Sequence, residues 1–179
     1  MNFKHRQLIT NNKQKGFTLM EVLVYMGLLS IIILTISLFI HWSIYSHTRA
    51  KAMREVSDNS REAMRLMIHE IQEAKSIYTP NTTSTQLSLE TKKYLPEGEE
   101  ASYIDFYLCE KKLCFKKESQ DPVALTGDRL EVNNLVFTQI GTSPPSVQIE
   151  LTLNYKNPQD RPEFRVSIDL TSTASLRSY

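Results

Sequence analysis

A single acidic residue, Glu21, interrupts an otherwise uncharged apolar run that extends from Phe17 to Trp42. About 20 apolar residues are enough for a helix to span a bilayer, so the length of this run predicts a transmembrane helix. A carboxylate inside a membrane is costly, by about 2.5–3.5 kcal/mol at the centre of a helix. We therefore expect Glu21 either to pair with a positive charge or to serve a function.

The charges of the chain are distributed unevenly around this run. Residues 1–16 carry Lys4, Arg6, Lys13 and Lys15 and no acidic residue. This basic leader predicts a cytoplasmic N-terminus and an exported C-terminal part. The whole chain has 21 basic and 20 acidic residues, so 17 basic and 20 acidic residues remain without the leader's four. A net charge of −3 on that remainder argues against nucleic-acid binding through a basic surface.

Length and hydropathy alone leave two interpretations open. A secretory signal has an apolar region of about 7–15 residues followed by a small-residue cleavage site. This run is longer, and His41–Tyr45 offers no such site. A signal anchor that only tethers a domain fits the hydropathy, with Trp42 and Tyr45 as interfacial aromatic residues. An anchor needs no carboxylate, however, so Glu21 and the residues before it favour a more specific role.

The junction Lys15-Gly16-Phe17-Thr18-Leu19-Met20-Glu21 combines a basic leader, a glycine and a long apolar continuation. It resembles the prepilin signal of type IV pilins and type II secretion pseudopilins, and the resemblance covers about residues 13–42. The resemblance implies that a membrane-embedded aspartic peptidase cuts after Gly16 and then N-methylates Phe17. It also implies that the leader, with its basic residues Lys13 and Lys15, stays in the cytoplasm.

The implied cleavage would give Glu21 a physical role in assembly. It creates a positive α-amino group on Phe17, which Glu21 of an incoming subunit can neutralise, and pairing is the expected solution for charges in a membrane. The partners implied are prepilin peptidase/methyltransferase, other pilin or pseudopilin subunits, an inner-membrane assembly platform and the lipid bilayer. Nucleic acid is not expected as a partner, although an exposed loop could still bind it.

The helix is expected to continue beyond the membrane, from about Phe17 to about Ile77. No proline precedes Pro80, and proline disfavours helical geometry in the residue before it. Steps of three and four residues place small or apolar side chains on one amphipathic stripe. The stripe comprises Met53, Val56, Ser60, Ala63, Met67, Ile71 and Ala74, and Met64 and Ile68 widen it. This divides the helical part into a transmembrane segment (17–42) and an amphipathic continuation (43–79).

After Pro80 the pattern changes to the two-residue alternation of strands. Strands are expected near Leu87–Glu90 and at Tyr103–Cys109, Lys112–Lys117, Leu130–Gln139, Ser146–Tyr155 and Phe164–Leu170, with a bulge or bend at Asn133-Asn134. One-sided alternation indicates an antiparallel sheet with one buried face. The predicted fold class is α+β and pilin-like. A long N-terminal helix, with a transmembrane first half, packs on the antiparallel β-sheet of an exported domain (residues 80–179).

Two of these strands, Tyr103–Cys109 and Lys112–Lys117, should form a hairpin. With Lys111-Lys112 as the turn, Cys109 faces Cys114 directly and Phe106 faces Lys117. Such a pair has Cα atoms about 4.5 Å apart, at the short end of what a disulfide tolerates. In an oxidising exported compartment we expect a disulfide between Cys109 and Cys114 rather than two free thiols. With only two cysteines and no histidine nearby in sequence, a zinc site is not expected.

No pattern in the sequence indicates catalysis, a cofactor or a metal. There is no nucleophile elbow, no glycine-rich phosphate loop and no paired-carboxylate signature. His69 and Glu73 are four residues apart on the predicted helix and could supply two metal ligands. A third and fourth ligand are missing, so a solvated or ion-paired His69 is the expectation.

The resemblance therefore implies a structural subunit rather than an enzyme. A minor subunit of a type IV pilus or related pseudopilus is favoured, because the C-terminal domain is large and has no repetitive stretch. The protein would cross the cytoplasmic membrane once and lie in the filament after assembly. The alternative is a membrane-tethered or filament-tip module that binds DNA, a surface or a secreted substrate. The sequence does not distinguish a pilus, a DNA-uptake apparatus and a type II secretion system.

Overall fold

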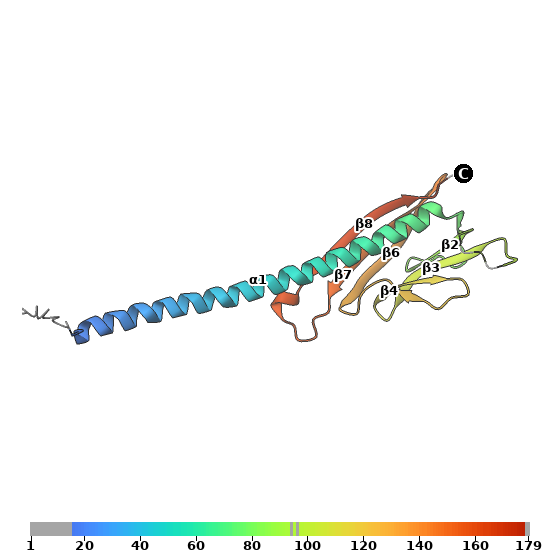
Figure 1. Cartoon of the computed structure of the whole chain (residues 1–179). Helices are drawn as coiled ribbons and strands as arrows, with labels where there is room; N and C mark the ends of the chain where they lie inside the picture. The colour runs from blue at the N-terminus through green and yellow to red at the C-terminus, as the bar shows by residue number, and fades with distance from the viewer. Residues whose placement is uncertain (1–15, 94, 96, 178–179) are drawn as a thin grey trace, which may run out of the picture. The chain divides into compact units, whose positions relative to one another are not determined.

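The computed structural model describes residues 16–93, 95 and 97–177. The chain divides into two compact units, residues 1–43 and residues 44–179. Helix α1 (Leu19–Glu73) begins in the first unit and ends in the second, and every strand lies in the second (Figure 1). The helix thus begins two residues after the predicted start at Phe17.

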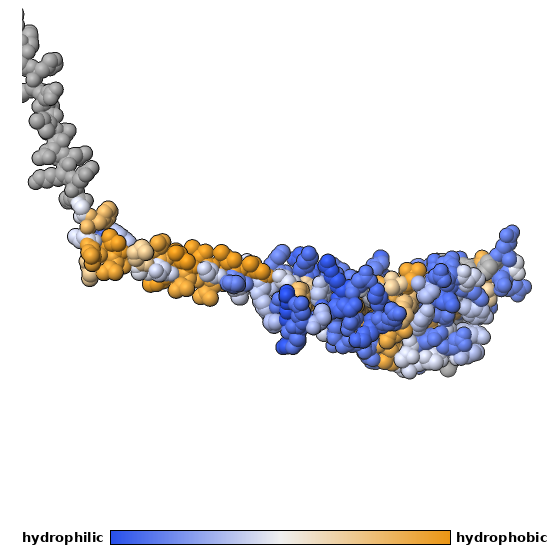
Figure 2. All heavy atoms as spheres, turned by 90° about the horizontal axis from the view of Figure 1, so that it is seen from below, coloured by the Kyte–Doolittle hydropathy of each residue, from blue (hydrophilic) through white to orange (hydrophobic). Residues whose placement is uncertain are grey.

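In the first unit almost nothing is buried. Every described side chain from Gly16 to Ser43 is exposed except Glu21, which is half-buried. Figure 2 shows the visible face of this part of α1 as mostly hydrophobic. Burying one large aliphatic or aromatic side chain is worth about 1.5–3 kcal/mol, so water strongly disfavours such a surface. Contiguous apolar surfaces of this kind mark sites covered by lipid or by other protein chains.

The strands of the second unit form two antiparallel sheets. The five-stranded sheet has the order β1 (Ser76–Ile77), β2 (Gln86–Thr91), β3 (Ser102–Cys109), β4 (Lys112–Lys117), β5 (Val123–Ala124). The three-stranded sheet has the order β6 (Leu130–Thr142), β7 (Pro145–Tyr155), β8 (Ser167–Ser175), with a 3₁₀ turn, η1 (Pro162–Phe164), between β7 and β8. The predicted α+β class, a long helix with antiparallel strands, is confirmed. The strands form two sheets rather than the single sheet expected.

The part of α1 in the second unit supplies one side of the core. Its buried side chains are Ala52, Val56, Ser60, Ala63, Met64, Met67, Glu70 and Ile71. The apolar members of this set join one hydrophobic cluster with residues of both sheets, such as Phe106 and Leu151. The predicted stripe agrees with this set except at its start, at Glu70, which is buried outside the stripe, and at Ile68, which is only half-buried. Met53 is 48% exposed and Ala52 is buried instead, because residues four apart, such as Ala52 and Val56, share one helix face.

The helix ends at Glu73, four residues before the predicted end near Ile77. The backbone N–H of Lys75 donates to the carbonyl of Glu90 on β2 at 2.8 Å. The Glu90 carboxylate also accepts from the side chains of Lys75 (2.5 Å) and Ser76 (2.7 Å). These contacts draw the chain into the five-stranded sheet as β1, which pairs with β2. A tertiary interaction therefore ends the helix before Pro80 can do so.

The β3–β4 hairpin forms at the predicted place but in a different register. Its turn residues are Glu110 and Lys111, both at positive φ (47° and 63°), rather than Lys111-Lys112. Cys109 consequently pairs with Lys112, and Phe106 pairs with Phe115 instead of Lys117. The two phenyl rings stack with centroids 4.9 Å apart. Such aromatic pairs contribute about 0.5–1.5 kcal/mol beyond their area burial, which favours the observed register.

The three-stranded sheet follows the predicted alternation with one correction. Along β7 the side chains of Val147, Ile149, Leu151 and Leu153 are buried. The register between β6 and β7 shifts between Val132 and Asn134, where a bulge or bend was predicted. Phe164 was expected to begin the last strand, but it lies in η1. There its ring stacks on Tyr155 with centroids 5.2 Å apart, and β8 starts at Ser167 and extends to Ser175.

Candidate functional site

The start of α1 is fixed by Thr18. Its carbonyl accepts from the backbone N–H groups of Glu21 (3.0 Å) and Val22 (3.2 Å). Its hydroxyl oxygen also accepts from the Glu21 N–H at 3.3 Å. Threonine in this position caps a helix by satisfying a backbone donor that would otherwise lack a partner. The cap places Glu21 in the first helical turn, where the helix dipole favours a negative charge.

The side chains around Glu21 form a small cluster on one face of the first turns. The Tyr25 hydroxyl donates to Oε1 of Glu21 at 3.2 Å. The Tyr25 ring also lies against Phe17, edge to face, with centroids 6.5 Å apart. Tyr25 thus contacts both residues that the sequence assigns to processing and assembly. Sequence reasoning missed this role, although the four-residue spacing between Glu21 and Tyr25 would have revealed that they share a helix face.

Glu21 has no ion-pair partner within the described part of the chain. The ion pairs found in residues 16–93, 95 and 97–177 join other side chains. The hydroxyl of Tyr25 offers one hydrogen bond but no charge. Among the described residues, the hydrogen bond from Tyr25 is therefore the polar contact made by the Glu21 carboxylate.

Among the described residues, none packs closely against Gly16. A Cβ atom added to Gly16 would meet no atom within 4 Å, and the same holds for Gly27 on α1. The backbone of Gly16 also lacks the positive φ that makes glycine necessary at Gly98 and Gly141. Packing among the described residues therefore does not require glycine at this position. The predicted leader residues Lys13 and Lys15 lie outside the described residues.

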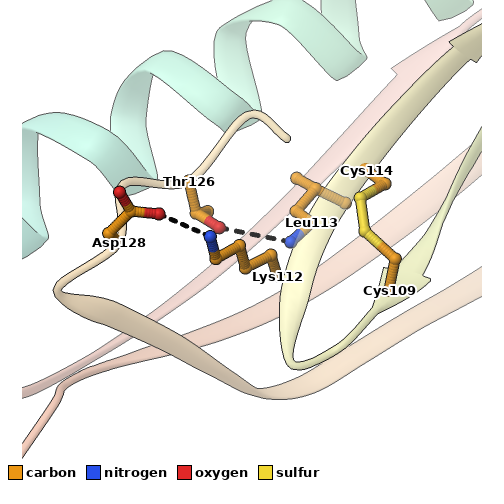
Figure 3. The surroundings of a disulfide bond; sticks show 6 residues. All are labelled: Cys109, Lys112, Leu113, Cys114, Thr126 and Asp128. Carbon is orange, nitrogen blue, oxygen red and sulfur yellow. Dashed lines mark hydrogen bonds and ion pairs between the residues drawn. A yellow bond between two sulfur atoms is a disulfide. The ribbon is translucent and has the colours of Figure 1, made fainter. Parts of the chain in front are cut away.

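The two cysteines are joined as a disulfide (Figure 3). Their Cα atoms are 5.9 Å apart, within the usual range for a disulfide. They are diagonal neighbours, since Cys109 pairs with Lys112 and Cys114 with Tyr107. Beside them the Lys112 ammonium contacts the Asp128 carboxylate at 2.5 Å. The bond therefore links β3 to β4 next to a contact with the segment before β6.

A buried carboxylate on α1, Glu70, escaped the sequence analysis. Its side chain is 3% exposed and its Oε1 lies 3.3 Å from the ammonium of Lys93, which follows β2. Lys93 also pairs with Glu73 at 3.1 Å, and His69 lies 3.7 Å from Glu73. The hydrogen bond to Lys93 is the main cause of the lowered pKa of Glu73. The expectation of an ion-paired His69 agrees with this geometry.

This cluster holds the residues after β2 against α1 and does not form a metal centre. Among the described residues, no group of three or more histidine, cysteine or carboxylate side chains is arranged to bind a metal ion. A periodic reading of the sequence could not have found Glu70, because a glutamate next to the apolar stripe is normally solvated.

The second unit also contains a cavity of about 780 Å³ where α1 ends. It is lined by residues of four segments: Glu73, Ala74, Lys75 and Ser76; Lys92; Ser143, Pro144 and Pro145; and Leu176 and Arg177. Three of these side chains are cationic and one is anionic. This cavity could not be predicted from local sequence patterns, because its walls come from distant parts of the chain.

α1 is the one helix in the described part of the chain that is long and apolar enough to cross a membrane. Its most apolar window has a mean hydropathy of 2.6 and is not buried within the protein. This fits the exposed hydrophobic surface of the first unit (Figure 2).

Comparison with known families identifies the N-terminal segment. The model of the prokaryotic N-terminal methylation motif matches residues 11–37. That range includes Gly16, Phe17, Glu21 and Tyr25. Comparisons with curated proteins and with solved structures gave no match.

Proposed function

We propose that this chain, which belongs to the type IV pilin and pseudopilin family, is a minor structural subunit of a type IV pilus or a related pseudopilus. The methylation motif supports membership of the family, and so does the long apolar helix packed on antiparallel sheets. Proteins of this family are generally structural and have no enzymatic activity. The minor role is favoured by a second unit that has its own extensive core.

The first step of the proposed function is processing at Gly16. Prepilin peptidase would remove residues 1–16, the leader that contains Lys13 and Lys15, and methylate the new N-terminus at Phe17. The absence of any atom within 4 Å of a Cβ on Gly16 supports this step. A peptidase that must bind the backbone closely would account for a glycine that folding does not need.

The second step is assembly through Glu21, and this residue carries the proposal. Cleavage creates an α-amino group on Phe17, and the described residues provide Glu21 with no other positive partner. In the filament, Glu21 of one subunit would pair with the Phe17 amine of its neighbour, since buried charges are stable only when paired. The Tyr25 hydrogen bond would hold the carboxylate in position for that pair.

The proposed topology follows from the same segment. Residues 17–42 would anchor the protein in the cytoplasmic membrane as a single span, with the N-terminus in the cytoplasm. Residues 43–79 would continue the helix, and residues 80–179 would fold on the exported side. An inner-membrane assembly platform would then move the subunit from the bilayer into the filament.

Mass spectrometry of the mature N-terminus tests this proposal. The chain would be purified from cells that contain an active prepilin peptidase and from matched cells that lack it. We expect a start at Phe17 carrying one methyl group in the first case and a start at Met1 in the second. An unprocessed Met1 start in both would contradict the proposed function.

A second candidate function, capture of a ligand by the exported domain, is favoured by the cavity at the end of α1. Its volume of about 780 Å³ lies in the range of small-molecule sites, about 300–1,000 Å³. The side chains of Lys75, Lys92 and Arg177 would favour an anionic group of a surface polymer, DNA or a secreted protein. Pull-down of such ligands with the second unit, compared with an Arg177→Glu variant, distinguishes this candidate from a purely structural role.

A further inference from the structure

Basic residues gather where α1 leaves its apolar run. No acidic residue occurs between Glu21 and Glu55, and the only Lys or Arg residues in that interval are Arg49, Lys51 and Arg54. All three side chains are exposed, whereas the helix face between them is already buried at Ala52. The interval between Glu21 and Glu55 therefore carries a formal charge of +3, and the next carboxylates of the helix, Glu55 and Asp58, follow Lys51 and Arg54 by four residues.

The connection between β7 and β8 adds further cations at this end of the second unit. Arg161 and Arg165, which flank η1, are both exposed. Arg165 is held by Asp160, with a contact of 2.7 Å. Its raised pKa is due mainly to that hydrogen bond and the charge of Asp160, and a smaller effect comes from Tyr45 on α1. In Figure 1 this connection lies at the end of the second unit where α1 enters it.

The position of these charges along the helix matches the depth of lipid headgroups. Trp42, the only tryptophan of the chain, ends the apolar run. At about 1.5 Å per residue, Arg49 and Lys51 follow it by about 10 Å and about 14 Å. Side chains on a helix tilt toward its N-terminus, and Arg and Lys extend their charged groups to the membrane surface. Their cations can thus reach back toward the phosphates beside Trp42.

These bases do not help to orient the protein. Positive charges within about 15–20 residues of a span favour the cytoplasmic side, so Arg49, Lys51 and Arg54 oppose the orientation that the leader sets. Once the leader is removed, they are also the nearest Lys and Arg residues to the apolar run. Because these three positive charges oppose the expected membrane orientation, we expect them to have a separate function on the exported side.

We propose that Arg49, Lys51 and Arg54 bind the phosphate groups of anionic phospholipids on the exported side of the membrane. The inference rests on membrane anchoring by residues 17–42 and goes beyond the proposed filament role. Basic clusters next to a span attract anionic lipids by direct Coulomb interaction within a Debye length. The bound lipids would hold the subunit at a fixed depth before it enters a filament.

Trp42 provides the probe for a direct test. The full chain is reconstituted in phosphatidylcholine vesicles that contain a minor fraction of phosphatidylglycerol. Brominated acyl chains, which quench tryptophan, are carried either by the phosphatidylglycerol or by an equal amount of phosphatidylcholine. At low salt we expect at least about twofold stronger quenching by the anionic lipid, because each base adds to its local enrichment. At ~1 M salt, where the Debye length is ~3 Å, the two lipids should quench equally.

Two triple variants assign the effect to these residues. The variant R49Q/K51Q/R54Q should lose the preference for phosphatidylglycerol. The control R61Q/K111Q/K116Q removes the same charge from exposed positions elsewhere in the second unit and should keep it. Equal quenching by both lipids in the unmodified chain would overturn the inference, as would a preference that survives the first variant or disappears in the control.

The source of the phosphate is tested in the same vesicles. Added inorganic phosphate or duplex DNA should leave the preference unchanged, and displacement of the lipid by either would assign a different ligand and overturn the proposal. Absence of quenching by either lipid would contradict membrane insertion itself. Since Trp42 reports on lipid whether or not the leader has been removed, failure of this test leaves the processing test at Phe17 to stand independently.

Discussion

Tyr25 donates a hydrogen bond from its hydroxyl to the carboxylate of Glu21, one helical turn before it, at a distance of 3.2 Å. The same ring contacts Phe17 edge to face. The residue proposed to become the N-terminus and the acid proposed to neutralise it in a neighbour are therefore linked through one aromatic side chain. The charge of Glu21 and its hydrogen bond to Tyr25 can therefore be tested separately by substitution.

Substitution of Glu21 by glutamine should block assembly without blocking processing. Glutamine preserves the size of the side chain and an oxygen that accepts from Tyr25, but it removes the charge that would pair with the Phe17 amine. We expect normal cleavage by mass spectrometry and at least about a tenfold loss from the sheared filament fraction, corresponding to about 1.4 kcal/mol. Tyr25→Phe is the matched control and should reduce incorporation less. Normal incorporation of the glutamine variant would refute charge pairing.

A methyl group at Gly16 should stop processing while leaving the fold intact. Since no atom lies within 4 Å of a Cβ at Gly16, Gly16→Ala should not change the thermal unfolding of the second unit. Gly27→Ala is the control, because its Cβ also meets open space and alanine favours a helix interior by about 1 kcal/mol. We expect a Met1 start for the first variant and a Phe17 start for the second by mass spectrometry.

Loss of the Lys93 side chain should destabilise the second unit. Removing it takes an opposite charge from the buried carboxylate of Glu70. Lys93 is itself partly exposed, so we expect Lys93→Ala to lower the free energy of unfolding by about 1–2 kcal/mol, less than for a fully buried pair. Arg65→Ala, which breaks an exposed pair with Glu62, should have a much smaller effect, because exposed ion pairs contribute little. Urea denaturation of the second unit measures both, and equal effects would contradict the role of burial.

The pair Lys75–Glu90 should make stability depend on pH at the acid end. Hydrogen bonds from Lys75 and then from Ser76 lower the pKa of Glu90. Its contribution is therefore present above the ordinary glutamate pKa of about 4.3 and is lost as pH falls through the lower folded value. We expect Glu90→Gln to destabilise the second unit by about 1 kcal/mol or less at neutral pH. The difference from the unmodified protein should vanish in strong acid, and a difference independent of pH would exclude the charge as its cause.

The disulfide should stabilise the second unit modestly. The residues Cys109 to Cys114 enclose a short loop, so removing the bond with Cys109→Ser/Cys114→Ser should lower the free energy of unfolding by about 2 kcal/mol on the loop-entropy estimate. Reduction of the unmodified protein should have a similar effect, measured by denaturation with and without a thiol reductant. If reductant changes nothing and free thiols are already titratable, the two cysteines are not paired in the purified protein.

Several features could be predicted because they depend on local pattern. Glu21 and its neighbours stand out by charge against an apolar background, and the stripe from Val56 to Ile71 follows helical spacing. Strand β7 alternates so regularly that its buried face was evident from the sequence alone. In each case the signal lies within one element and needs no knowledge of what packs against it.

Other features could not be predicted because distant residues set them. Neither possible hairpin turn, Glu110-Lys111 or Lys111-Lys112, contains the glycine or asparagine that favours positive φ. The turn residues therefore do not select a register, whereas the stacking of Phe106 on Phe115 favours the observed one. Strand β1 likewise could not be predicted from the local sequence, because it forms by pairing of Ser76 with Glu90 on β2.

By itself, the sequence determined that this protein has a basic N-terminal segment, an apolar helix with one carboxylate, and an amphipathic helix followed by antiparallel strands. Charge, hydropathy and periodicity are properties of neighbouring residues, so the chain displays them without folding. Only the tertiary structure decided where α1 ends, which residues oppose each other in the β3–β4 hairpin, that the strands form two sheets, and that Glu70 is buried beside Lys93. In each case the local sequence is compatible with more than one arrangement. Contacts between residues far apart in the sequence stabilise the arrangement that is observed.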